Sequence, residues 1–110
     1  MKDDEAYLLH VRDAIDAIVG YTTGGRSEFN RDRKTQDAVV RNLEIIGEAV
    51  KRLSADLTAQ HPDIPWRRIA GMRDKLIHDY FGVDLDLVWE VVRQELPTLR
   101  RRVESILAVR

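Results

Sequence analysis

The chain has 110 residues, 44% of them hydrophobic, which suffices for one domain with a single core of moderate size. It contains no cysteine, so disulfides, thiolate catalysis and cysteine-based zinc sites are excluded. The formal net charge of −1 argues against a general nucleic-acid binder, so any such contact must come from local basic clusters.

The first half of the chain reads as two helices and a short helical piece. A first helix is predicted from about Asp3 to Val19, because apolar residues recur at helical spacing and Gly20 follows. A longer one is predicted from about Asp32 to Leu53, with a short piece around Ser54 to Gln60. The apolar stripes of the two helices comprise Leu8, Val11, Ile15, Ile18 and Val19 in the first, and Val39, Leu43, Ile46, Val50 and Leu53 in the second.

Two further helical regions are predicted in the second half. Pro65 suits the first turn of a helix that continues to Gly82, because the missing N–H of proline costs nothing there. Asp84 or Asp86 can cap the last region, which Pro97 should kink or split. The expected fold is therefore all-α, an up-and-down bundle of about four main helices with short additional helical pieces.

The same sequence predicts one domain, over residues 1–110, in the cytoplasm. No apolar run approaches the roughly 18 residues of a membrane span, and the N-terminus lacks the basic and apolar regions of a signal peptide. The histidines, His10, His61 and His78, are too scattered for a metal-binding motif. We therefore expect no metal, no other cofactor and no membrane partner.

Arg73, His78 and Tyr80 form the most informative cluster. Arginine binds phosphate, histidine transfers protons near neutral pH and tyrosine offers a hydroxyl, so the three suit phosphodiester chemistry. Chance gives roughly 0.01 occurrences of this spacing at this composition. On one straight helix, residues five apart are displaced by about 140°, so Arg73 and His78 would point apart. Fraying of the helix before Gly82, or dimerisation, could bring them together.

Other residues could support this cluster. The basic side chains of Arg67, Arg68 and Lys75 are candidates for RNA binding. Asp74 could orient the motif arginine or position a proton, or it could be an ordinary exposed carboxylate. Glu48 could pair with the motif arginine or lie on the surface, whereas the glycine before it should permit close helix approach, since mid-helix glycine costs about 1 kcal/mol against alanine.

The Arg-x4-His-x-Tyr pattern resembles that of the HEPN superfamily, and specifically the HepT-like ribonuclease toxins. The likeness extends to residues 41–49, to Pro65-Trp66 and to residues 80–84. It implies a metal-independent endoribonuclease that acts as a homodimer on an RNA substrate, with two motifs facing one cleft. Arg73 and His78 would be catalytic, and the products would carry a 2′,3′-cyclic phosphate and a 5′-hydroxyl.

The resemblance also implies regulation within a toxin–antitoxin pair. In HepT-like proteins the motif tyrosine accepts AMP from a partner, the minimal nucleotidyltransferase MntA, so Tyr80 would be the acceptor here. A core tyrosine that only packs is the other interpretation. For the whole chain, the alternative to an enzyme is a non-catalytic helical binding partner of a nucleotidyltransferase. A plain dimerisation domain would leave the motif unexplained.

Overall fold

Long helices make up most of this computed structural model, which describes residues 2–78 and 82–109 and the side chains of residues 3–77 and 82–109. The predicted all-α fold is confirmed. The strands of the described part form one hairpin, with two residues in each strand. In chain order, the elements are α1 (Lys2–Tyr21), α2 (Gly25–Arg31), α3 (Arg33–Lys51), α4 (Ala55–Gln60), α5 (Trp66–Ala70), α6 (Met72–Leu76), β1 (Ile77–His78), β2 (Gly82–Val83), α7 (Leu85–Glu90), the π-helix η1 (Val91–Glu95) and α8 (Leu96–Ala108).

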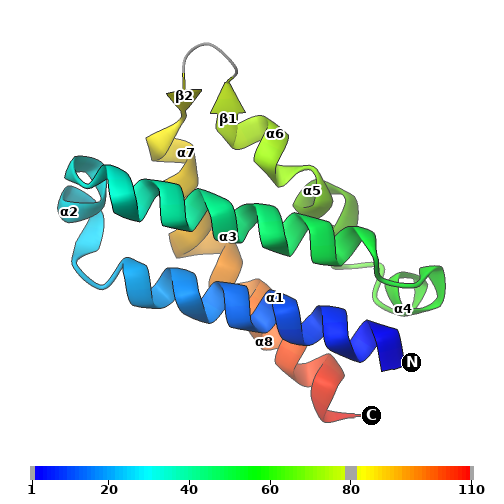
Figure 1. The fold of residues 1–110 in the computed structure, drawn as a ribbon. Coiled ribbons are helices and arrows are strands. Elements are labelled where there is room, and N and C mark those ends of the chain that lie inside the picture. Colours follow the sequence, from blue (N-terminus) through cyan, green and yellow to red (C-terminus); the bar gives the residue numbers. More distant parts are fainter. Residues whose placement is uncertain (1, 79–81, 110) are drawn as a thin grey trace.

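Helices α1 and α3 pack along each other and form one layer of the bundle (Figure 1). The continuous run of α7, η1 and α8 lies behind them, where α8 packs against α1. Helices α5 and α6 contact the other edge of α3, and the hairpin projects beyond the end of α6. The described part of the motif segment, from Arg73 to His78, therefore runs from the side of α3 towards one end of the molecule.

The predicted apolar stripes form the core, with one exception. All five stripe residues of α3 and its extension are buried, as are four of the five in α1, whereas Val19 is 54% exposed. The last helical run contributes Val88, Val91, Val92, Leu96, Leu99, Val103 and Ile106. Burial of one face on each long helix accounts for the bundle, because apolar burial is the main favourable term in folding.

Side-chain caps fix where several helices begin. The Asp32 carboxylate accepts hydrogen bonds from the backbone N–H groups of Lys34 and Thr35 at the start of α3. Asp84 accepts one from the N–H of Leu87, which confirms Asp84 as the cap of α7. These carboxylates satisfy amides that have no partner within the first turn of a helix.

The expected continuous helix from Pro65 to Gly82 is wrong. It breaks at Gly71 into α5 and α6, ends at Leu76, and passes into the hairpin. Residues 77–83 are rich in β-branched and aromatic types, which favour extended backbone over helix. A second difference is α2, which the sequence did not predict and which buries Phe29 against Trp89, with ring centroids 5.4 Å apart.

The expected break at Pro97 is a change of helix type and not an end of the helix, because α7, η1 and α8 follow one another without a gap. The turn before this proline is the π-helix η1, and Pro97 lies in the first turn of α8. Proline lacks an N–H and crowds the carbonyl four residues earlier, and a π-type turn relieves both problems without ending the helix. Within the described ranges, no helix combines the length and apolar composition needed to cross a membrane.

Candidate functional site

Arg73 lies on α6, and α6 ends three residues later. Ile77 follows Leu76 with φ −113° and ψ 122°, so the backbone leaves the helix and becomes extended before His78. Arg73 and His78 therefore do not lie on one helix, and the displacement of about 140° expected between them does not apply. Fraying of the helix before Gly82 was one of the two expected ways to bring Arg73 and His78 together. The helix does not merely fray but ends at Leu76.

The hairpin ties the two ends of the motif segment together. Ile77 pairs with Val83 and His78 pairs with Gly82 in antiparallel register, and the N–H of Asp84 donates to the carbonyl of Leu76 at 2.9 Å. Gly82 has φ +80°, a left-handed conformation that glycine adopts readily and other residues rarely do. Backbone hydrogen bonds thus join residues 76–78 to residues 82–84. Tyr80 and the side chain of His78 lie outside the described part of the chain.

Glu44 on α3 holds the Arg73 side chain. The Nε–H of Arg73 donates to Oε2 of Glu44 at 2.6 Å, and the Arg73 Nη1 lies 3.7 Å from Oδ1 of Asp74. Arg73 keeps 51% of its side chain exposed, whereas Glu44 keeps 29%. A guanidinium has five N–H donors in a planar fork, so donors remain free for an anion after the bond to Glu44.

Of the two interpretations of Glu48, a partner of Arg73 or a surface residue, the structure shows the surface residue. Glu48 is exposed one turn further along α3 and lies 3.7 Å from Nζ of Lys51. The predicted close approach at Gly47 is confirmed, because a Cβ on this glycine would lie 3.1 Å from the carbonyl oxygen of Ala70. The contact with α5 therefore passes through Gly47, and the glutamate one turn before it faces α6.

The remaining candidates flank Arg73 on the surface. Asp74 is 86% exposed, which fits the ordinary surface interpretation as well as a supporting role. Arg67 and Lys75 are exposed and line a shallow hollow, together with Arg68, Pro65 and Gly71. These basic side chains lie close enough to one another to act as one cationic surface beside the motif.

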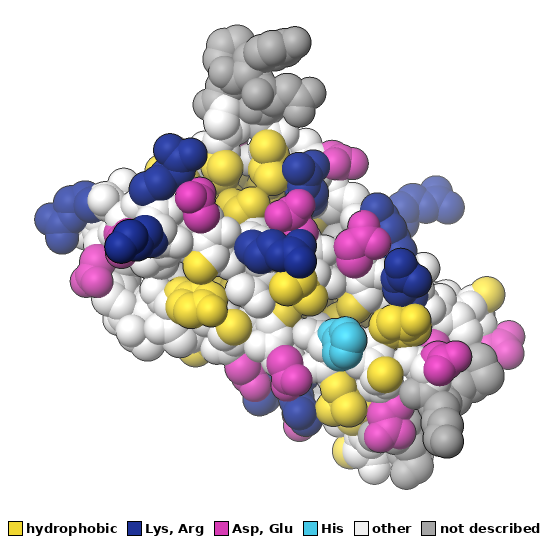
Figure 2. All heavy atoms as spheres, viewed as in Figure 1, with side chains coloured by type: hydrophobic (Ala, Val, Ile, Leu, Met, Phe, Trp, Pro, Cys, Tyr) yellow, Lys and Arg dark blue, Asp and Glu magenta, His cyan; other side chains and the backbone are white. Residues whose placement is uncertain are grey.

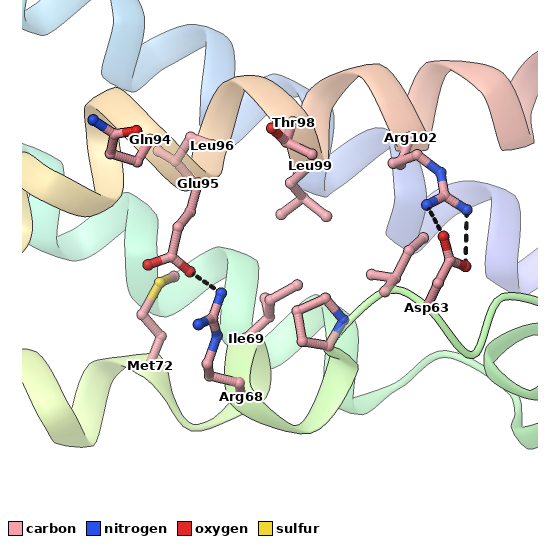
Figure 3. A pocket seen from close by; sticks show the side chains of 12 residues that line it. Asp63, Arg68, Ile69, Met72, Gln94, Glu95, Leu96, Thr98, Leu99 and Arg102 are labelled. Carbon is pink, nitrogen blue, oxygen red and sulfur yellow. Dashed lines mark hydrogen bonds and ion pairs between the residues drawn. The ribbon is translucent and has the colours of Figure 1, made fainter.

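Arg68 also forms an ion pair at one end of a groove between α5 and the η1–α8 run (Figure 3). Its Nη2 pairs with Oε1 of Glu95, and a second pair, between Arg102 and Asp63, closes the other end. The hydrogen bonds from Arg102 lower the pKa of the Asp63 carboxyl below its ordinary value of 3.8. The groove encloses about 270 Å³ and is lined between these pairs by Ile64, Ile69, Met72, Leu96 and Leu99.

Glu44 is the site residue that the sequence did not reveal. Glu44 and Glu48 occupy successive turns of α3, and sequence periodicity does not show which of them faces α6. The clue in the sequence was Gly47. A glycine at a helix contact indicates that the crossing helix lies beside the turn before it. Reading Gly47 in that way would have favoured Glu44.

Comparison with known proteins identifies the family of the chain. The family model described as "Ribonuclease HepT-like" matches residues 11–106. The chain is 48% identical over 101 residues to "Probable ribonuclease HepT" of Thermococcus cleftensis, covering 91% of this chain and 92% of that protein. It is 43% identical over 108 residues to "Putative RNase TTE0752" of Caldanaerobacter subterraneus subsp. tengcongensis, covering 97% and 96%. No solved structure gives a significant match. The chain therefore belongs to the HepT-like ribonuclease family.

Proposed function

We propose that the chain is a metal-independent endoribonuclease whose catalytic residues are Arg73 and His78. Family membership supports the ribonuclease activity. The observation that carries the assignment of residues is the end of α6 at Leu76, since it removes the one geometric objection to their acting on the same phosphate. The exposed Arg73 guanidinium, fixed through one edge by Glu44, adds an oriented phosphate-binding group.

In the proposed reaction the ribose 2′-oxygen attacks the adjacent phosphorus while the bond to the 5′-oxygen breaks. His78 removes the proton from the 2′-hydroxyl, and a second histidine, from the partner subunit, protonates the leaving 5′-oxygen. Arg73 binds the phosphate and stabilises its added negative charge in the transition state. The products carry a 2′,3′-cyclic phosphate and a 5′-hydroxyl, and neither step requires a metal or another cofactor.

The homodimer is part of this proposal, because one chain has a single His78 for two proton transfers. A two-fold dimer would place a second motif opposite the first, as the family resemblance implies. Light scattering at micromolar concentration should give about twice the 12.7 kDa chain mass. A monomer with full nuclease activity would refute the shared cleft.

Regulation follows the same resemblance. We infer that the chain is the toxin of a toxin–antitoxin pair and that an MntA-type nucleotidyltransferase transfers AMP to Tyr80. The adduct adds bulk and about one negative charge next to the motif, so it opposes RNA binding both sterically and electrostatically. Tyr80 is two residues from His78, which supports an effect on the same site.

The test is cleavage of single-stranded RNA by the purified protein in excess chelator. His78→Ala should abolish cleavage while the melting temperature is retained, and 2′-deoxy-substituted RNA should remain intact because it lacks the nucleophile. His61→Ala is the matched control, since only the His61 backbone carbonyl is needed for the hydrogen bond from Trp66. Dependence on added magnesium would refute the mechanism. Failure of the wild type to cut any RNA would favour the binding-partner alternative.

A further inference from the structure

The charge around Arg73 implies that phosphate binding needs additional cations. Glu44 and Asp74 both lie within 4 Å of its guanidinium, so two negative charges offset the one positive charge of Arg73. Lys75 brings these four side chains to neutral, and because Arg68 is paired with Glu95, Arg67 is the local positive surplus. An RNA strand carries one negative charge per phosphate, so a surplus of one charge holds a strand of several phosphates only weakly.

A surface groove on the neighbouring turns of α3 carries such cations. The groove lies between α1 and α3, encloses about 300 Å³, and is lined by Tyr7, His10, Arg41, Ile45, Glu48, Ala49 and Arg52. We call it the α1–α3 groove. Figure 2 views the molecule from this side and shows basic side chains over α3 and towards the motif end. Arg41 is three residues before Glu44, so the groove begins one turn from the residue that holds Arg73.

The two arginines of the groove lie near the same face of α3. Arg41 lies on α3 and Arg52 is the C-cap residue of that helix, eleven residues later, which places them near the same face and about 16 Å apart along the axis. Both are exposed, and neither has an ion-pair partner among the described residues. Two acidic residues lie between them, and both are paired with other cations: Glu44 with Arg73 at 2.6 Å and Glu48 with Lys51 at 3.7 Å. The groove thus has two unneutralised positive charges.

Aromatic rings form the opposite wall. The His10 ring is exposed and stands edge-on to Tyr7, with centroids 6.3 Å apart and planes at 87°. A line of arginines beside accessible rings is the combination that binds single-stranded nucleic acid, because the cations follow the backbone and the rings stack on bases.

We propose that the α1–α3 groove binds the backbone of single-stranded RNA next to the scissile phosphate. The inference deepens the proposed function, because it assigns the strand a path from Arg73 over α3. Arg41 and Arg52 each contact a phosphate, and His10 stacks on a base. The groove raises the affinity for long substrates without taking part in bond cleavage.

The test measures RNA binding by full-length protein in a His78→Ala background, so that no substrate is consumed. Arg41→Gln/Arg52→Gln should reduce the slope of log K against log salt by about 1.4, from about 0.7 for each lost contact with a single strand. The matched control is Arg31→Gln/Lys34→Gln, which removes two exposed charges from α2 and the start of α3 and should leave the slope unchanged. Circular dichroism melting checks that both double variants fold.

The outcomes separate this inference from the proposed function. An unchanged salt slope in the groove variant, or an equal reduction in the control, would refute the groove as an RNA site, even if the wild type cleaves RNA. If RNA binding is unchanged while binding of the nucleotidyltransferase weakens, the groove is a protein interface and the inference is wrong. Lack of cleavage by the wild type would count against the proposed function alone, because the binding measurement does not depend on it.

Discussion

Replacing Glu44 tests how the motif arginine is held. Glu44→Ala removes both the acceptor for the Arg73 Nε–H and a negative charge, whereas Glu44→Gln keeps an acceptor oxygen and removes only the charge. The two variants therefore separate orientation from electrostatics. We expect Glu44→Ala to lower kcat and Glu44→Gln to leave it nearly unchanged.

The structure sets the magnitudes. The pair is half exposed on the Arg73 side, so its loss should cost only about 0.5–1 kcal/mol of stability, or about 4 °C in Tm. A guanidinium that is no longer fixed can be misplaced by an ångström, which lowers kcat about ten- to a hundredfold. Removing a charge about 7 Å from the bound phosphate weakens repulsion by about 0.6 kcal/mol in water, or about threefold in KM.

The assay is steady-state cleavage of a labelled RNA at fixed ionic strength, with Tm measured in parallel. The expected pattern is a lower KM for both variants and a lower kcat for Glu44→Ala alone. If kcat of Glu44→Ala equals that of the wild type, Glu44 does not position Arg73. If Glu44→Gln loses as much kcat as Glu44→Ala, the carboxylate charge and not the hydrogen bond is what matters, and the orientation argument is wrong.

Three further variants test packing, regulation and acid stability. Gly47→Ala should lower the unfolding free energy by about 1 kcal/mol in chemical denaturation, because crowding against the Ala70 carbonyl exceeds the gain in helix propensity; a stabilised variant would contradict this. Tyr80→Phe should gain no AMP mass on incubation with the cognate nucleotidyltransferase and ATP, and modification at the wild-type level would exclude Tyr80. The hydrogen bond from Arg100 lowers the pKa of Asp16 below 3.8, so its stabilising effect is present above that pH and is lost as the pH falls further. Asp16→Asn should therefore reduce the dependence of stability on pH below about 4, and an unchanged dependence would show that the pair contributes nothing.

The parts of the fold that follow from helical periodicity were predictable. The stripe from Val39 to Leu53 is buried as expected, because on a long helix the apolar positions leave one possible inward face. Caps were predictable for a similar reason, since Asp84 precedes an apolar run and has a carboxylate that reaches the first-turn amides. These features depend on residues near each other in the chain.

The short elements around the motif were not predictable in the same way. Met72, Leu76 and Gly82 suggested one helix, but five residues of α6 are too few for propensity to decide, and the hairpin pairing of Ile77 with Val83 prevails. The partner of Arg73 depends on how α6 crosses α3, which a single sequence does not fix. The glutamate beside Arg73 was therefore not predictable, whereas the assignment of Arg73 and His78 to a catalytic site stays a prediction.

The near-neutral surroundings of Arg73 also bear on the proposed regulation. Arg73, Lys75, Glu44 and Asp74 cancel one another, so one chain holds RNA at this point through other charges, such as Arg67 beside the motif, the α1–α3 groove or a second subunit. In a site with a large positive surplus, one added negative charge would change little. Here the surplus is small, so under the proposed regulation an AMP group on Tyr80 would remove a large share of it. A balanced site is therefore one that a single covalent modification can control.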